Sequence, residues 1–161
     1  MAIDPGASGA IVSTNTSLSL TVSRNMPGTE ADICEEIRRH CMGGGNVSPL
    51  AYPVVIENVG AYVSGDAATS ACKFAKHCGV LEGIMTALSI PFDRVAPQVW
   101  MKAYVGKIAY PKRCDNAGKK KTYRKNVVKA RSQQLFPSIT VTLANADALG
   151  MLWFAMEKRR G

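Results

Sequence analysis

The sequence predicts an α/β fold in which a mixed β-sheet is covered by helices. Three observations lead to this prediction. Short β-rich segments joined by tight turns fill the first 24 residues, two apolar strands come later, and segments of helical periodicity separate and follow them. The chain has 161 residues, which suits a single domain, 1–161, built around one hydrophobic core.

The first three strands are expected to form an antiparallel unit. Residues 1–4 and 9–14 are apolar or β-branched and flank a Gly-rich bend at residues 4–9. Residues 17–24 alternate between apolar and small polar side chains, which is the period of a half-buried strand. Antiparallel pairing follows because the connections between these segments are short. The first strand has only three residues before Asp4, so part of it could precede residue 1.

Helices and strands then alternate along the chain. Thr29 fits the N-cap of a helix, and the apolar run that ends at Glu57 is typical of a central parallel strand. The predicted order after the third strand is helix 30–42, strand 53–57, helix 71–88, strand 91–95, helix 97–106, helix 122–135 and helix 145–158. The expected sheet therefore has five strands, three antiparallel and then two parallel, flanked by helices.

Positive charge is concentrated in one segment, residues 107–131. This segment holds ten Lys and Arg residues and a single acid, Asp115, so its net charge is +9, while the rest of the chain sums to −1. Concentrated positive charge favours a polyanionic partner, and nucleic acid is the commonest one. A solvated basic loop is the alternative interpretation of this feature alone.

The composition excludes several classes of protein. With 47% hydrophobic and 20% charged residues, the chain resembles an ordinary globular protein. It has no apolar run of ~20 residues, so we expect no membrane span, and its N-terminus lacks the features of a secretory signal. Its five cysteines form no CxxC pair, and their odd count argues against a disulfide framework. We therefore expect a reducing, cytoplasmic location.

Three acidic residues stand out by their positions. Asp4 ends the first strand, Glu57 ends the apolar strand, and Asp147 lies near the start of the last helix. Each has small or apolar neighbours, among which a lone carboxylate is costly to bury. Carboxylates at the ends of adjacent central strands converge, and a divalent cation such as Mg²⁺ or Mn²⁺ would offset their repulsion. Taken singly, each acid could equally be structural: a turn residue, a strand-end charge or a helix-start charge.

The same residues fall within motifs that resemble the RuvC-like Holliday-junction resolvases of the RNase H-like superfamily, especially the branch found in bacteriophages. The similarity spans nearly the whole chain in order. The matching segments are residues 3–11 (IDPGASGAI), 55–59 (VIENV), 74–83 (FAKHCGVLEG), 95–102 (VAPQVWMK), Lys125 with 135–137 (LFP), and 146–149 (ADAL).

This resemblance implies a Mg²⁺-dependent endodeoxyribonuclease that resolves four-way DNA junctions, with Mn²⁺ able to substitute and two ions per active site. Asp4, Glu57 and Asp147 match three of the four metal-binding positions of the family. The other position lies three to five residues before the last acid, where this chain has no acidic side chain, and Asn145 is the nearest polar one. Weak ligation by Asn145, action of Asp147 without a fourth ligand, and an engineered sequence all remain open.

The resemblance also implies how DNA and a second subunit would be bound. Tyr62 lies where relatives present an aromatic group to unstacked bases at the junction centre, although a surface tyrosine in a loop is an equal alternative. Relatives act as twofold-symmetric dimers, and the helix at 71–88, with Phe74 and Met85, resembles their dimer helix. These apolar residues could equally be core, and Trp100 is expected to be core. The phosphate-binding residues would be Lys119, Lys120, Lys121, Arg124, Lys125 and Lys129.

Other functions stay open at this point. A related nuclease could prefer flaps, forks or RNA–DNA hybrids over four-way junctions. Without the fourth acid, the chain could also bind junctions without cutting them. A fragment of a sugar-kinase or actin-like ATPase is disfavoured, because that fold needs a second Gly-rich phosphate loop and far more residues.

Overall fold

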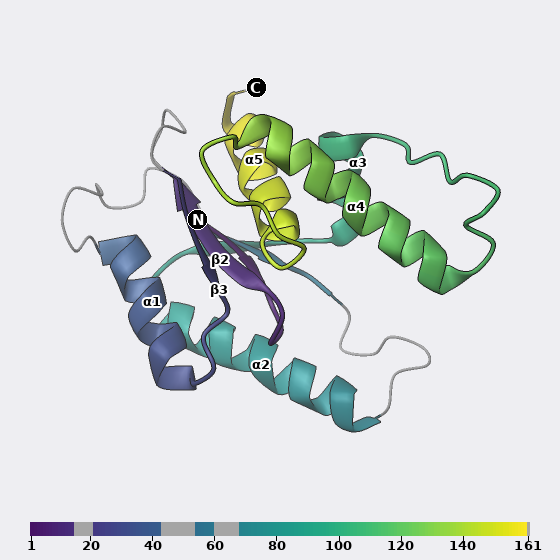
Figure 1. Cartoon of the computed structure of the whole chain (residues 1–161). Helices are drawn as coiled ribbons and strands as arrows, with labels where there is room; N and C mark the ends of the chain where they lie inside the picture. The colour runs from purple at the N-terminus through teal and green to yellow at the C-terminus, as the bar shows by residue number, and fades with distance from the viewer. Residues whose placement is uncertain (15–20, 43–53, 60–67, 161) are drawn as a thin grey trace.

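The computed structural model describes residues 1–14, 21–42, 54–59 and 68–160, with the side chains of 159 and 160 excepted. Figure 1 shows a central sheet with helices on both of its faces. Parts of three predictions fall outside the described residues: the beginning of the strand expected at 17–24, the first residue of the strand expected at 53–57, and Tyr62. In the described part of the chain, no helix is long and apolar enough to span a membrane.

The sheet has five strands in the order β3-β2-β1-β4-β5. The strands are β1 (Ala2–Asp4), β2 (Ala10–Thr14), β3 (Thr21–Asn25), β4 (Val54–Glu57) and β5 (Phe92–Val95). Strands β1, β2 and β3 pair antiparallel, whereas β4 pairs parallel with both β1 and β5. The predicted fold class, with three antiparallel strands followed by two parallel ones, is therefore confirmed.

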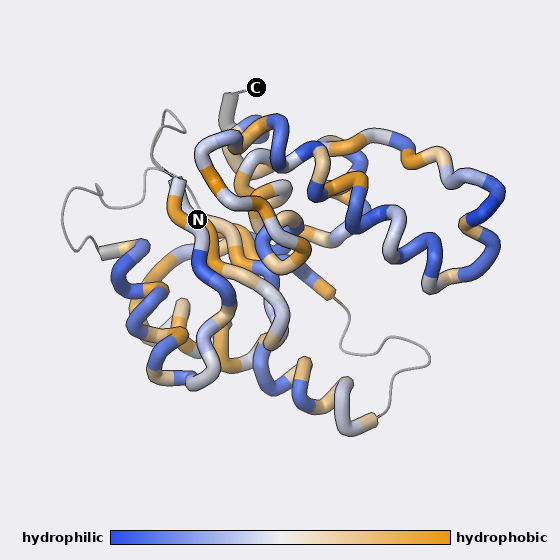
Figure 2. The backbone as a smooth tube through the Cα atoms, viewed as in Figure 1, coloured by the Kyte–Doolittle hydropathy of each residue, from blue (hydrophilic) through white to orange (hydrophobic). Residues whose placement is uncertain are grey.

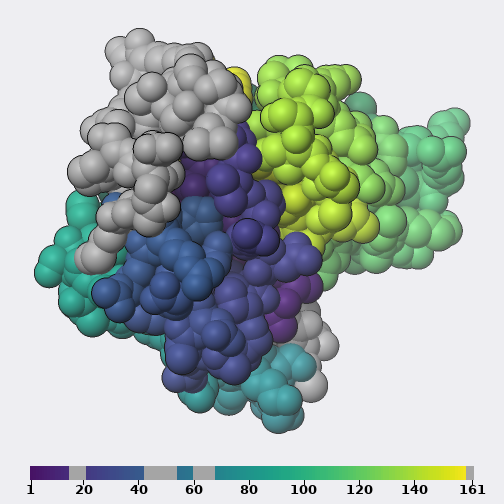
Figure 3. All heavy atoms as spheres, turned by 60° about the vertical axis from the view of Figure 1, so that its left-hand side comes forward, coloured from purple at the N-terminus to yellow at the C-terminus, as the bar shows by residue number. Residues whose placement is uncertain are grey.

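The two faces of the sheet are covered by different helices. One face is covered by α1 (Glu30–Met42) and α2 (Ala68–Ala87), and the other by α3 (Pro97–Val105), α4 (Ala117–Leu135) and α5 (Ala146–Arg160). Figure 3 looks toward the β3 edge, where α1 and the segment leading into α5 lie on opposite sides of the strands. Figure 2 shows hydrophobic segments in the sheet and mostly hydrophilic residues along α1 and the first half of α4.

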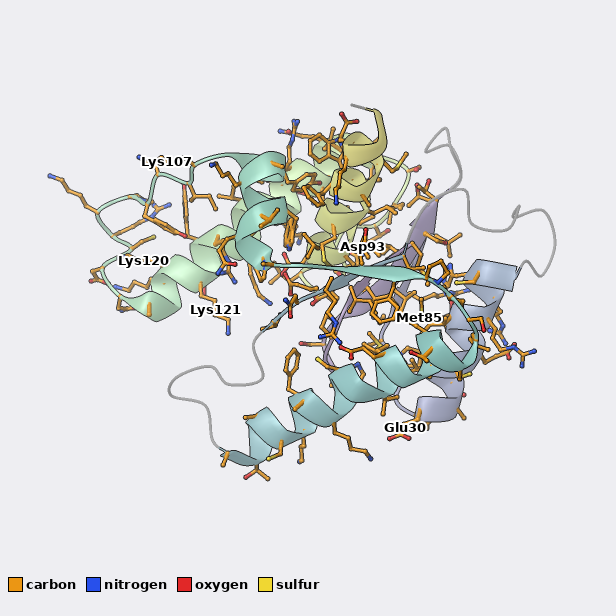
Figure 4. All side chains as sticks on the ribbon, turned by 180° about the vertical axis from the view of Figure 1, so that it is seen from behind. Glu30, Met85, Asp93, Lys107, Lys120 and Lys121 are labelled. Carbon is orange, nitrogen blue, oxygen red and sulfur yellow. The ribbon has the colours of Figure 1, made fainter. Side chains whose placement is uncertain are left out.

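Alternation along β1 divides the core between these faces. Ala2 packs in the cluster that includes Leu149 of α5, while Ile3 packs with Ile37 of α1 and Met85 of α2. Small residues such as Ala2 and Ala10 allow α5 to lie close to β1 and β2. Met85, labelled in Figure 4, is fully buried, so it belongs to the core of this chain rather than to an exposed dimer face.

Two helices begin earlier than their patterns predicted. Helix α2 begins at Ala68 instead of residue 71, and α4 begins at Ala117 instead of residue 122. The reason is clear for α4, because the Asn116 side chain caps it by accepting a hydrogen bond from the backbone N–H of Lys119 at 2.9 Å. The run Lys119–Lys121 that suggested a loop is thus part of the first turns of a helix.

Candidate active site

Asp4 is held at the end of β1 by a turn that requires glycine. Gly6 has φ +110°, a conformation that side chains rarely adopt, and the Gly9 N–H donates to the Gly6 carbonyl at 3.0 Å. A Cβ at Gly9 would lie 2.0 Å from the Asp4 carbonyl oxygen. The close return of the chain to β2 therefore fixes the backbone of Asp4 and requires glycine at position 9.

Glu57 lies at the same end of the sheet because β1 and β4 run parallel. Their register pairs Ile3 with Ile56, so Asp4 and Glu57 are the next residue along each strand. The Trp100 indole N–H donates a 2.9 Å hydrogen bond to Glu57 Oε1. Trp100 is only 1% exposed, as expected for a core residue, but its contact with Glu57 also makes it part of the site.

Asp147 reaches this end of the sheet from the first turn of α5. All three carboxylates are half-buried, and desolvation by burial is the main cause that raises the pKa of each above its usual value. The negative charges of Glu57 and Asp147 raise the pKa of Asp4 further. Asp147 likewise raises the pKa of Glu57. The three predicted acids therefore lie near enough to one another to repel.

Basic residues of α4 face these acids. The positive charge of Lys125 opposes the raised pKa of all three carboxyl groups, and that of Arg124 opposes it for Glu57 and Asp147. A hollow of about 510 Å³ lies here, and its lining includes Glu57, Asp147 and Trp100. Its remaining lining includes Tyr110, Lys120, Lys121 and Arg124. We call this hollow the carboxylate cleft.

The donor chemistry of the cleft suits a hard divalent cation. Carboxylate oxygens are the ligands that Mg²⁺ prefers, and close carboxylates with raised pKa values gain from a positive charge between them. Within the ranges that the structure describes, however, no three His, Cys, Asp or Glu side chains stand close enough to hold a metal ion together. One oxygen of Glu57 is already directed toward Trp100.

Asn145, predicted as a weak ligand, has another role. Its Oδ1 accepts hydrogen bonds from the backbone N–H of Thr142 at 2.8 Å and from the Thr142 hydroxyl at 3.2 Å. Its Nδ2 donates to Ser23 Oγ of β3 at 3.0 Å and to the Thr140 carbonyl. Because these contacts use the carbonyl oxygen of a residue only 5% exposed, Asn145 fastens the loop before α5 to the sheet, and we leave it out of the ligand set.

Comparison with known proteins adds a match of fold. No protein-family model matches the sequence, and no curated protein sequence does either. A structure of Thermus thermophilus RuvC aligns with a TM-score of 0.54 at 15% identity. A structure of T. thermophilus RuvC in complex with a Holliday junction substrate aligns with a TM-score of 0.58 at 16% identity. Each alignment covers 99% of this chain and 94% of the RuvC chain.

The chain has the fold of RuvC. The predicted RuvC-like architecture is thus confirmed, although these matches do not support the bacteriophage branch in particular. In this RuvC fold, the carboxyl ends of β1 and β4 and the first turn of α5 bring Asp4, Glu57 and Asp147 to one end of the sheet.

The predicted DNA-binding residues separate into groups. Lys120, Lys121 and Arg124 line the carboxylate cleft. The positive charge of Lys125 lowers the pKa of the neighbouring carboxyl groups. Figure 4 shows Lys120 and Lys121 on the N-terminal turns of α4. Lys119 instead forms an ion pair of 3.0 Å with Asp115, and it lines a different hollow together with Arg113 and Tyr123. Lys129 is half-buried one turn beyond Lys125.

The two aromatic residues that line the cleft, Trp100 and Tyr110, had not been predicted as functional. Trp100 sits among apolar residues, so the sequence favoured a core position and gave no sign of its hydrogen bond to Glu57. The sequence could have indicated a role for Tyr110 in nucleic-acid binding, because it is one of two tyrosines within the basic segment 107–131. Aromatic residues interleaved with cations are typical of nucleic-acid-binding surfaces.

Proposed function

We propose that this protein is a divalent-metal-dependent endonuclease that cuts branched DNA, with the four-way junction as its substrate. The observation that carries the proposal is the carboxylate cleft. Two of the three neighbouring carboxylates line it, and so do Lys120, Lys121 and Arg124. Acids that favour a metal and cations that favour phosphate thus occur in one hollow, a combination that suits metal-dependent phosphodiester hydrolysis.

Asp4, Glu57 and Asp147 are the residues that would hold Mg²⁺, or Mn²⁺ in its place, with two ions per site. Bound there, such ions would lower the pKa of a water and stabilise the leaving oxygen. Trp100 would keep one Glu57 oxygen fixed, so that the other is presented to the cleft. We infer that the side chains draw together when a cation offsets their repulsion.

The cations of α4 have two roles in this proposal. Lys120, Lys121 and Arg124 would bind the phosphates of the strand in the cleft and set its register. Lys125, whose charge already acts on all three carboxyl groups, would stabilise the negative charge that develops on the reacting phosphate. The position of the DNA strand would thus depend on Lys120, Lys121 and Arg124. The rate of the chemical step would depend on Lys125.

The choice of a four-way junction rests on the fold match with the RuvC–junction complex together with the motifs in the sequence. Symmetric cutting of such a junction needs two active sites, so we propose a twofold homodimer. Exposed positions of α2, rather than the buried Met85, would then supply its contact surface. An origin within the bacteriophage branch stays a prediction from the motifs.

The test is incubation with a synthetic four-way junction and Mg²⁺ or Mn²⁺, with linear duplex and flap DNA as controls. Paired, symmetric nicks in the junction are the expected result. Asp4→Asn is expected to lose at least about 100-fold in rate while still binding the junction. Preferential cutting of the flap would instead identify a related branched-DNA nuclease.

A second candidate, a protein that binds junctions without cutting them, is favoured by one observation. The position three residues before Asp147 is Ala144, and the only nearby amide, Asn145, is used in structural hydrogen bonds. Binding of the junction with no cleavage in either metal would establish this candidate and contradict the nuclease proposal.

A further inference from the structure

Tyr110 is an exposed aromatic residue on the wall of the carboxylate cleft. It lies in the segment between α3 and α4 and is 42% exposed, whereas most large apolar side chains in the described part of the chain are covered. The cleft that it lines also contains Glu57, Asp147 and Arg124. Exposure alone does not indicate a ligand site, but the position of this ring beside cations and carboxylates places it where a ligand in the cleft can reach it.

The ring of Tyr110 packs against a second tyrosine. Its centroid lies 5.9 Å from that of Tyr123 of α4, with an angle of 56° between the planes, the tilted geometry that aromatic pairs favour. Tyr123 is half-buried and faces the neighbouring hollow with Arg113 and Lys119. Tyr110 is therefore held against α4 by Tyr123, and 42% of its surface stays open to solvent.

The surroundings determine which ligand fits this ring. Lys120, Lys121 and Arg124 offer contacts to a phosphate backbone, and a π-face beside such contacts suits a nucleobase. The bases of an intact duplex are paired and stacked on their neighbours, so their faces are closed to a side chain. Only an unpaired nucleotide can place its base against Tyr110 while its phosphates lie along α4.

We propose that Tyr110 stacks on a base left unpaired at the branch point, next to the phosphate held in the carboxylate cleft, and so selects branched DNA over continuous duplex. This inference rests on the proposed function, since it assumes that a DNA strand enters the cleft. Tyr110 would supply the shape preference that the cations cannot, because phosphates are present in every DNA.

The test measures DNA binding in EDTA, where no cleavage occurs, for wild type, Tyr110→Ala, Tyr110→Phe and Val99→Ala. The DNAs are a fork with unpaired nucleotides at the branch and a continuous duplex of the same length. Val99 is a matched control, since it is 53% exposed on α3 but lines a different hollow. Stacking on an aromatic contributes about 1–3 kcal/mol per base, so Tyr110→Ala should weaken fork binding roughly 5- to 150-fold.

Tyr110→Phe and Val99→Ala should bind the fork like wild type, and duplex binding should change little in all variants. Unchanged fork binding by Tyr110→Ala would overturn the proposal. So would an equal weakening for duplex, or an equal weakening in Tyr110→Phe, because neither fits stacking on an unpaired base. These outcomes are separate from nuclease activity, whose absence in Mg²⁺ and Mn²⁺ would count against the proposed function alone.

A second measurement uses only the wild-type protein, so its result does not depend on whether the alanine variant folds. The fork carries 5-iodouracil at an unpaired position and is irradiated in the complex. We expect a photo-crosslink on the tryptic peptide of residues 108–112, which contains Tyr110. Crosslinks confined to other peptides would contradict the inference.

Discussion

The indole N–H of Trp100 donates to Glu57 Oε1 across 2.9 Å, and so a buried residue of α3 fixes a carboxylate at the end of β4. Gly150 of α5 makes this packing possible, since a Cβ there would lie 2.7 Å from the Trp100 ring. Strand β4 and helices α3 and α5 thus meet at one side chain, and the position of Glu57 depends on all three.

Trp100→Phe tests this relationship, because phenylalanine keeps an aromatic ring but has no N–H to donate. Removing a partner that orients a metal ligand typically costs 10–100-fold in metal affinity or activity, so we expect the half-saturating Mn²⁺ concentration to rise by about that factor. Isothermal titration with Mn²⁺ measures the affinity, and cleavage assays over a range of Mn²⁺ measure the activity.

Tyr104→Phe is the matched control, since it removes the hydroxyl of another buried aromatic residue of α3. That hydroxyl lies 2.9 Å from Ser132 Oγ, away from the carboxylates. Its removal should lower the free energy of unfolding by about 1 kcal/mol without changing Mn²⁺ affinity. Equal Mn²⁺ affinity in wild type and Trp100→Phe would show that Trp100 serves packing only.

The raised pKa values of the acids predict how stability depends on pH. Burial raises the pKa of Asp4, Glu57 and Asp147 in the folded state, and repulsion by neighbouring acids raises that of Asp4 and Glu57 further. Between the usual carboxyl pKa and the raised one, the folded chain therefore binds more protons than the unfolded chain. Without metal, their contribution to stability falls as pH rises through this window and stays low above it. Mg²⁺ or Mn²⁺ should restore stability at neutral pH by binding the folded state.

Thermal unfolding of wild type and Asp4→Asn, with EDTA and with Mg²⁺, measures this effect. Comparing the two proteins cancels contributions such as that of His40, whose lowered pKa acts in the opposite direction. In EDTA, at a pH above this range, Asp4→Asn should be more stable than wild type. Added Mg²⁺ should raise the stability of wild type more than that of Asp4→Asn. A wild type that is the more stable of the two in EDTA would contradict the repulsion between the acids.

The positions of the lysines in α4 predict different effects on DNA binding. Lys120, Lys121 and Arg124 line the cleft, so replacing each with alanine should weaken junction binding and lower the slope of log K against log salt by about 0.9 for each phosphate that is no longer neutralised. Lys119→Ala is the matched control, because this residue is paired with Asp115 and faces another hollow. An equal drop in slope for Lys119→Ala would mean that the DNA does not follow the cleft.

The turn after Asp4 predicts a sharp difference between two glycines. In Gly9→Ala the new Cβ would lie 2.0 Å from the Asp4 carbonyl oxygen, so we expect stability to fall by more than about 1 kcal/mol and cleavage to be abolished. In Gly79→Ala the Cβ meets nothing within 4 Å inside α2, and stability should rise by about 0.5–1 kcal/mol. Chemical denaturation measures both, and a tolerated Gly9→Ala would contradict the described turn.

How much the sequence could predict depends on the range of the interaction involved. The strand ending at Glu57 and the Gly-rich turn after Asp4 are local patterns, and both predicted their structures correctly. Contacts between segments far apart in the chain were harder to predict from the sequence. The bond from Trp100 to Glu57 spans 43 residues and the bond from Asn145 to Ser23 spans 122, so neither leaves a periodic signal. Charge alone likewise could not separate Lys119 from Lys120, because only the rotation of α4 places them on different hollows.

The most direct test of the proposed site is a crystal structure of the protein soaked in Mn²⁺, with anomalous scattering used to locate the ions. We expect Mn²⁺ bound by carboxylate oxygens of Asp4, Glu57 and Asp147 at the mouth of the cleft, and no such ion in Asp4→Asn crystals. Mn²⁺ absent from these three residues, at a concentration that saturates any measured activity, would contradict the metal-dependent nuclease.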